Sequence, residues 1–249
     1  MRIQLGKLFL ILSVPVIAVT AWWIYSSASD SYAFPPLSEI MTRFHELWLF
    51  DRFTSDVIPS LARFALGLAG GTITGLLLGV WLGSSRNVRE TFDPVIQFVR
   101  SLPPPALLPV FLLAFGLGDP MKIFIIAFGS MWPVLLNTVE GIRGIDPTLK
   151  ATFEVYNISP LKRLASVIIP AAANSIFAGL KTALGIAFVL MIVSEMVAAS
   201  GGIGHFVVES QHTYAIADMW SGIILLGVLG FLFNVLFDQI QKRAVYWPV

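Results

Sequence analysis

The chain is 249 residues long, carries a net charge of +1 at pH 7, contains no cysteine, and is 56% apolar but only 12% charged. The near-neutral charge argues against an electrostatic footprint for nucleic acid, and the lack of cysteine excludes disulfides, thiolate catalysis and iron–sulfur ligation. Because soluble chains carry about 25% charged residues, this composition and a mean hydropathy of +0.81 predict an integral membrane protein.

Six stretches are apolar enough to cross a bilayer whose hydrocarbon core is roughly 30 Å thick, so we expect an all-α polytopic fold. They cover about residues 8–27, 58–83, 94–116, 121–142, 172–199 and 219–240. The first is longer than the core of a secretory signal, which has about 7 to 15 residues, so we expect a retained helix. We therefore divide the chain into an N-terminal transmembrane helix (1–28), an extracytoplasmic segment (29–57) and a membrane core (58–249).

The basic residues predict the orientation, because Lys and Arg near short loops stay in the cytoplasm. With the N-terminus inside, ten basic residues fall on the inner side and three on the outer side. This distribution predicts that both termini and the polar segment 150–172 are cytoplasmic. The inner residues are Arg2, Lys7, Arg86, Arg89, Arg143, Lys150, Lys162, Arg163, Lys242 and Arg243; the outer ones are Arg43, Arg52 and Lys122.

The segment 29–57 holds apolar residues at helical spacing. Pro36 stands where such a helix would begin. We expect an amphipathic helix that either lies in the outer membrane interface or packs on the protein's own spans. Its apolar positions are Leu37, Ile40, Met41, Phe44, Leu47 and Trp48.

The second span carries a glycine at every fourth position, which leaves a smooth groove along one helix face. Such faces let helices pack closely, and we favour this interpretation over a surface that lines a passage. The glycines are Gly67, Gly71, Gly75, Gly79 and Gly83.

The third span contains Pro103, Pro104, Pro105 and Pro109. Each proline removes a backbone donor and clashes with the preceding turn, so the helix cannot be continuous. Broken backbone is tolerated in a membrane where other helices or a water-filled cavity satisfy the freed groups. We predict an interrupted helix beside a passage, with a kink covered by other helices as the alternative.

Charged residues inside the spans are rare and usually functional. Arg100 and Lys181 could either snorkel to an interface or line a path, whereas the short side chain of Glu195 favours a functional role. Dense glycines after Glu195 indicate a turn or re-entrant backbone, and His205 and His212 lack a third ligand for a metal. Our candidates for a translocation path or gate are Arg100, Pro103, Pro104, Pro105, Lys181, Glu195, Gly201, Gly202 and Gly204.

Catalytic motifs are missing from the sequence. There is no H-E-x-x-H, no G-x-S-x-G and no G-x-x-x-x-G-K-[ST] phosphate-binding loop. We expect no catalytic residue, no metal and no cofactor on this chain, so any energy from ATP must come from another polypeptide.

Five segments together resemble the permease subunits of bacterial ABC importers of the sulfonate, taurine and nitrate type, over about residues 34–247. They are "SLARFALG", "DPVIQFVRSLPPPALLPVFLLAFGLGD", "GLKTALG", "SEMVAASGGIG" and "DQIQKR". The resemblance implies a cytoplasmic coupling hairpin at 146–170, which ends at Pro170 and docks on the ATPase. Asn157 stands where the family usually has glycine, and Ala151 where it usually has glutamate. The implied coupling residues are Ala151, Thr152, Phe153, Glu154, Tyr156, Asn157, Ser159, Pro160, Lys162 and Arg163.

The resemblance also implies the partners and the mechanism. It implies two copies of a P-loop ATPase that hold ATP and Mg, a second permease subunit in a homodimer, and a periplasmic or lipid-anchored solute-binding protein. The chain would sit in the bacterial inner membrane, in contact with lipid, and import a small solute such as an organic anion by alternating access. The alternative from the residues is a secondary transporter or channel that uses Glu195 and Arg100; a membrane scaffold is less favoured.

Overall fold

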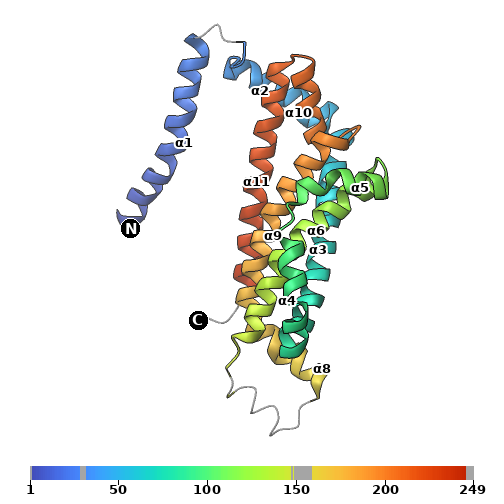
Figure 1. Cartoon of the computed structure of the whole chain (residues 1–249). Helices are drawn as coiled ribbons and strands as arrows, with labels where there is room; N and C mark the ends of the chain where they lie inside the picture. The colour runs from blue at the N-terminus through green and yellow to red at the C-terminus, as the bar shows by residue number, and fades with distance from the viewer. Residues whose placement is uncertain (1, 29–31, 147, 149–158, 245–249) are drawn as a thin grey trace.

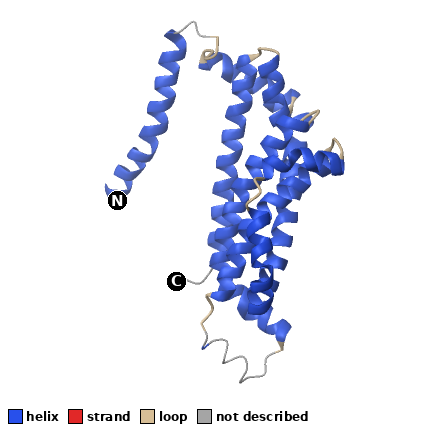
Figure 2. Ribbon diagram, viewed as in Figure 1, coloured by secondary structure: helices blue, strands red, loops and turns tan. Residues whose placement is uncertain are grey.

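The computed structural model describes residues 2–28, 32–146, 148 and 159–244 of the chain. Within these ranges every element is helical and no strand is present (Figure 2). This agrees with the prediction of an all-α membrane protein. The elements are α1 (Arg2–Ala28), α2 (Leu37–Glu46), η1 (Leu47–Asp51), η2 (Phe53–Val57), α3 (Ile58–Ser84), α4 (Arg86–Arg100), η3 (Pro104–Leu107), α5 (Leu108–Phe115), α6 (Asp119–Arg143), α8 (Pro160–Arg163), η4 (Leu164–Ile168), α9 (Ile169–Ala198), α10 (Ile203–His212) and α11 (Ile216–Ala244).

Four helical segments of the described chain are long and apolar enough to cross a membrane. They are Phe53–Ser84, Asp119–Arg143, Leu164–Val197 and Ile216–Ala244, and a fifth crossing is obtained if α4 and the helices after it count as one broken span. The prediction of six spans is therefore too high. From the first predicted span, the apolar helix Ser13–Ser26 is shorter than these four.

The bundle has two ends, which Figure 1 separates clearly. We name the α2 end after α2; it also holds α10 and the beginnings of α3, α6 and α11. We name the α8 end after α8; it also holds the end of α6 and the beginning of α9. Helix α1 stands apart from the bundle, and its contacts lie at the α2 end, where Trp22 meets Trp220 with ring centroids 4.9 Å apart.

The glycines of α3 face α6 and let the two helices approach closely. A Cβ atom at Gly71 would lie 2.2 Å from the Ser130 hydroxyl, and one at Gly75 would lie 2.7 Å from the Met131 carbonyl oxygen. No side chain fits at these distances, so only glycine permits this packing. The prediction of a packing face is confirmed, because α3 and α6 form a closely packed helix pair.

The predicted amphipathic helix is α2, and it packs on the protein's own helices. Its apolar residue Ile40 is fully buried, and Trp48, which follows in η1, is 2% exposed. The Trp48 indole donates a hydrogen bond to the Ser221 hydroxyl on α11 (3.1 Å). Burial of these side chains fixes the segment before α3 against α10 and α11.

The third predicted span is interrupted, as the prolines indicate. Helix α4 ends at Arg100, and the helices after Pro103 turn away by 79°. Pro104 begins η3, where a missing backbone N–H is tolerated because the first turn of a helix has no partner for it. Figure 1 shows α5 projecting from the side of the bundle after this break.

Helical backbone continues without interruption from α8 through η4 into α9. The turn η4 is π-helical, because the Ile169 N–H bonds to the carbonyl of Leu164, five residues earlier. This wider turn precedes Pro170 and accommodates its ring, which would otherwise clash with the preceding turn. As a result, one continuous helical segment connects the α8 end with the middle of the bundle.

Candidate functional site

A cavity of about 410 Å³ opens beside the break in the third span. We name it the break cavity. Helices α6 and α9 contribute residues from near their midpoints, so the cavity lies at half the depth of the bundle. Its ten lining residues are Arg100, Pro104 and Pro105 from the broken span, Gly129, Trp132 and Pro133 from α6, and Gly185, Ile186, Val189 and Leu190 from α9.

Small residues make room for the cavity and for the packing around it. A Cβ atom at Gly129 would lie 2.1 Å from Leu190 and 3.4 Å from Pro104, so this glycine lets α9 and η3 approach α6. A Cβ atom at Gly185 would meet nothing within 4 Å. Gly185 therefore borders open space, whereas Gly129 lies at the contact between α6, α9 and η3.

The cavity wall carries few polar groups. Arg100 is the one charged residue in the wall, and no ion pair or hydrogen bond joins its guanidinium to another described residue. The indole Nε1 of Trp132 is covered by protein and also has no hydrogen-bond partner. Both side chains are donors without an acceptor among the described residues.

The predicted path residue Lys181 does not line the break cavity. Its Nζ lies 2.6 Å from Asp238 Oδ1 on α11, and both side chains are about half exposed. The ion pair joins α9 to α11 nearer the α8 end than the break cavity. Pro103 lies at the N-cap of η3 and is exposed. Of the three consecutive prolines, Pro104 and Pro105 line the cavity.

The other predicted path residues meet in a separate buried ion network at the α2 end. Glu195 is fully buried near the end of α9 and accepts hydrogen bonds from the Ser60 hydroxyl (2.7 Å), from Arg63 Nη1 (2.7 Å) and from the Gly204 backbone N–H (3.0 Å). Arg63 also donates to Asp119 (2.7 Å) and to the Gly201 carbonyl (3.0 Å). Donors from α3 and α10 thus surround the carboxylate.

The glycine turn between α9 and α10 is shaped by this network. Gly202 has φ +117°, and a Cβ atom there would lie 2.5 Å from the carboxyl carbon of Glu195. Its N–H donates to Asp56 Oδ1 (2.8 Å). Glycine is required here because a side chain would meet both backbone strain and the carboxylate.

Charges in and beside the buried ion network balance. The cations Arg52, Arg63 and Lys122 face the carboxylates of Asp56, Asp119 and Glu195 in ion pairs of 2.7 to 3.5 Å. With its hydrogen bonds satisfied, Glu195 is poorly suited to hold a transported ion or proton. This disfavours the alternative of a secondary transporter that uses Glu195.

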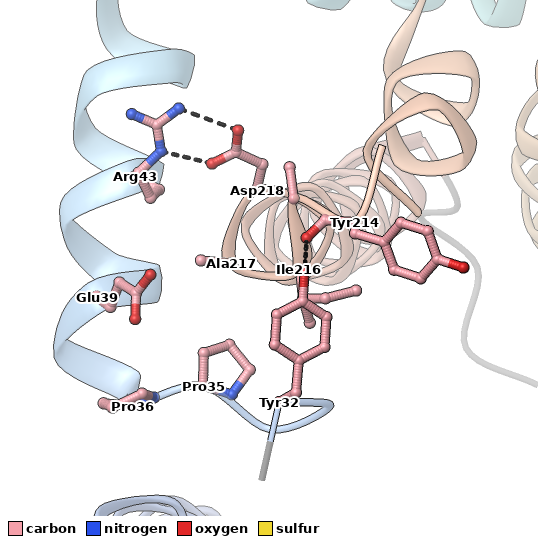
Figure 3. Close-up of a pocket in the computed structure, with 10 residues that line it drawn as sticks. Tyr32, Pro35, Pro36, Glu39, Arg43, Tyr214, Ile216, Ala217 and Asp218 are labelled. Atoms are coloured by element: carbon pink, nitrogen blue, oxygen red, sulfur yellow. Dashed lines mark hydrogen bonds and ion pairs between the residues drawn. The ribbon is translucent and has the colours of Figure 1, made fainter. Parts of the chain in front are cut away.

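A second cavity, of about 460 Å³, lies at the α2 end between α2 and the start of α11 (Figure 3). Arg43 donates to both carboxylate oxygens of Asp218 and to Glu46 (2.7 Å), and its hydrogen bonds to Asp218 raise the pKa of the guanidinium. The cavity wall contains Glu39, Arg43 and Asp218, which sum to one negative charge. This cavity therefore does not favour an anion.

Most of the predicted coupling residues lie outside the described ranges: Ala151, Thr152, Phe153, Glu154, Tyr156 and Asn157. Of the others, Ser159 and Lys162 are exposed at the α8 end, Pro160 begins α8 and Arg163 ends it. Before the undescribed residues, Asp146 accepts a hydrogen bond from the Thr148 backbone N–H (2.7 Å), which lowers the pKa of the carboxyl.

Sequence reasoning missed several residues of both sites. One helix face holds Asp56, Ser60 and Arg63, because they are spaced by four and three positions. This polar face on an otherwise apolar span was the signal that the sequence offered. The sequence could not single out Trp132, because tryptophan is common in protein cores. Only the structure shows that its indole N–H has no partner.

Known proteins resemble this chain in sequence and in fold. The family described as "Binding-protein-dependent transport system inner membrane component" matches residues 71–245. The putative aliphatic sulfonates transport permease protein SsuC of Bacillus subtilis is 29% identical over 95% of this chain and 86% of its own length. The bicarbonate transport system permease protein CmpB of Synechococcus elongatus is 34% identical over 89% of this chain and 84% of its own length. The nitrate import permease protein NrtB of Leptolyngbya laminosa is 33% identical over 76% of this chain and 68% of its own length.

Solved structures share the fold. A chain of the MetNI methionine ABC transporter in an inward-facing conformation superposes with a TM-score of 0.65 at 21% identity, over 76% of this chain and 94% of that one. A chain of a bacterial alginate ABC transporter, solved with an alginate-bound periplasmic protein, gives a TM-score of 0.62 at 15% identity over 98% of each chain.

Proposed function

Because the chain belongs to the family of binding-protein-dependent transport system inner membrane components, we propose that it is the permease subunit of an ATP-driven importer of a small anion. The sulfonate, nitrate and bicarbonate named for its relatives are all anions. The observation that carries the proposal is the break cavity. Broken backbone, an unpaired cation and open space coincide there at half the depth of the bundle.

The position of the break cavity supports a role in the translocation path. Irregular backbone at membrane depth is tolerated beside a cavity, and transporters place substrate sites near the bilayer midplane on discontinuous helices. Arg100 and the prolines of η3 meet both conditions. In this proposal the buried ion network has another task, which is to hold the outer ends of α3, α6, α9 and α10 together.

The proposal includes partners that this chain needs for energy and delivery. The chain has no phosphate-binding loop of its own, so two copies of a P-loop ATPase would hold ATP and Mg and act at the α8 end, which we assign to the cytoplasm with both termini. A second copy of the permease would complete the path, and an extracytoplasmic binding protein would deliver solute to the α2 end. The alginate transporter that shares this fold was solved with a periplasmic protein, and we propose a similar arrangement here.

The continuous helix from α8 to α9 supports a direct mechanical connection. It begins at Pro160 beside the predicted coupling residues and carries Gly185, Ile186, Val189 and Leu190 in the wall of the break cavity. Movement of an ATPase against the α8 end would be transmitted along this helix to the wall of the break cavity. We propose that closure of the ATPase pair changes the access of the cavity in this way.

Coupling can be tested in proteoliposomes that contain the complete transporter and its binding protein. We expect Phe153→Asp or Tyr156→Asp to abolish uptake and substrate-stimulated ATP hydrolysis, because a carboxylate would be buried in an aromatic protein interface. Glu140→Gln, an exposed carboxylate at the same end, should leave both unchanged. Normal uptake in both aspartate variants would contradict the coupling assignment.

A further inference from the structure

We propose that the break cavity is a binding site for an organic oxyanion, with a sulfonate or carboxylate head at Arg100 and Trp132 and a short apolar tail along α9. The inference rests on the proposed function and deepens it by naming the chemical class of the solute. It also selects among the substrates of the relatives, because nitrate and bicarbonate have no apolar tail.

The head group is specified by the donors in the wall. Arg100 is the one charged residue among the ten that line the cavity, and it has no partner among the described residues. A planar guanidinium binds carboxylate-like anions through two parallel hydrogen bonds. Arg100 also lies in the last turn of α4, where a cation is stabilised by the helix dipole.

Trp132 supplies a second donor to the same wall. Its Nε1 is covered by protein and has no acceptor, a state that is costly for a buried donor. The ring also packs against Phe128, with centroids 5.7 Å apart in an edge-on contact. In our proposal an oxyanion beside Arg100 accepts from this N–H after a small rotation of the indole, so that Trp132 positions the head group.

The tail is specified by the remaining wall. Ile186, Val189 and Leu190 present branched apolar side chains, and the prolines opposite them have no backbone N–H to donate. Such a surface cannot hydrate a polar solute but stabilises methylene groups, each of which strengthens binding about fourfold when buried. A cavity of about 410 Å³ is at the small end of the range for ligand sites, roughly 300 to 1,000 Å³.

Gly185 provides a direct test, because a side chain there would occupy the cavity without a clash. A Cβ atom at Gly185 meets nothing within 4 Å, and the same is true of Gly227 on α11, which does not line the cavity. Gly185→Leu therefore fills the site, and Gly227→Leu is the matched control. Arg89→Gln, on the same helix as Arg100 but outside the cavity, controls for loss of a positive charge.

The experiment is a calorimetric titration of the full chain in lipid nanodiscs with the subunits that copurify, at an ionic strength fixed with sodium chloride. The probes are methanesulfonate, ethanesulfonate, butanesulfonate, nitrate and butyltrimethylammonium. We expect butanesulfonate to bind at least about tenfold more tightly than methanesulfonate or nitrate, and the cation not to bind. Arg100→Gln should weaken butanesulfonate about tenfold or more, and Trp132→Phe several-fold.

Gly185→Leu should abolish the gain from the longer tail, while both control variants bind as the wild type does. Equal affinity for nitrate and butanesulfonate, no saturable binding of any sulfonate, or wild-type binding by Gly185→Leu and Arg100→Gln would overturn the proposal. The titration needs no ATP, so its outcome is separate from that of the proposed function. ATP-driven uptake with an unchanged sulfonate preference in these variants would refute the site and leave the importer assignment intact.

Discussion

Replacing Glu195 with Ala removes the centre of the buried ion network, and we expect a large loss of stability. The carboxylate is fully buried and accepts from Ser60, Arg63 and Gly204. Without it, the Arg63 guanidinium, 10% exposed, keeps one ion pair, with Asp119, and its hydrogen bond to the Gly201 carbonyl. The hydroxyl and the backbone N–H lose their acceptor at the same time.

The magnitude follows from these contacts. Removing one partner of a buried ion pair costs about 3–5 kcal/mol, because the other charge stays buried. Since Arg63 keeps Asp119, which is 56% exposed, we expect the lower end, about 3 kcal/mol. For chains of this size 1 kcal/mol corresponds to roughly 2–4 °C in melting temperature, so the expected decrease is about 6–12 °C.

The assay is thermal unfolding of the purified protein in nanodiscs, followed by intrinsic fluorescence. Glu209→Ala on α10 is the control, because its carboxylate is 51% exposed, and surface substitutions usually change stability by less than about 0.5 kcal/mol. A double variant of Glu195→Ala with Arg63→Ala should lose less than the sum of the two single losses. If Glu195→Ala melted within about 2 °C of the control, the network would not hold this end of the bundle.

Three further predictions concern the α3–α6 contact, the glycine turn and an ion pair at the α2 end. Gly71→Ala should destabilise the chain by about 1–3 kcal/mol through overpacking against α6. The control Gly70→Ala, whose Cβ would lie 3.5 Å from its nearest neighbour, should melt as the wild type does. Equal melting temperatures for the two variants would contradict the α3–α6 packing. Gly202→Ala should lower the melting temperature because φ is +117° and the new Cβ would meet the buried carboxylate; wild-type melting would show that the turn is not constrained. Asp218→Asn should cost less than about 1 kcal/mol because its partner Arg43 is part exposed, and a loss above 3 kcal/mol by the same assay would contradict this.

The sequence predicted those features of the fold that depend on local chemistry. Prolines from Pro103 onward indicated the interrupted span because no helix tolerates three in succession, and glycines such as Gly71 indicated a packing face through their spacing alone. The amphipathic segment that became α2 was also visible as a pattern. The predicted number of spans exceeds the four or five that the described residues provide, because the broken third span counts only if its two parts are taken together.

Partners that are distant along the chain could not be predicted. Glu195 was recognised as unusual, but its partner Ser60 lies 135 residues away, and no spacing rule connects residues on different helices. The sequence therefore grouped Glu195 with Arg100 in one path, whereas the structure places them in two separate sites. The unpartnered indole N–H of Trp132 could not be predicted for the same reason, because the lack of an acceptor depends on how the helices pack.

The most direct test of the central proposal is uptake of radiolabelled butanesulfonate into proteoliposomes under two energy sources. The account predicts uptake that requires ATP, a copurifying P-loop ATPase and the solute-binding protein, and that does not respond to a proton or sodium gradient. Uptake driven by an ion gradient through the purified chain alone would contradict it.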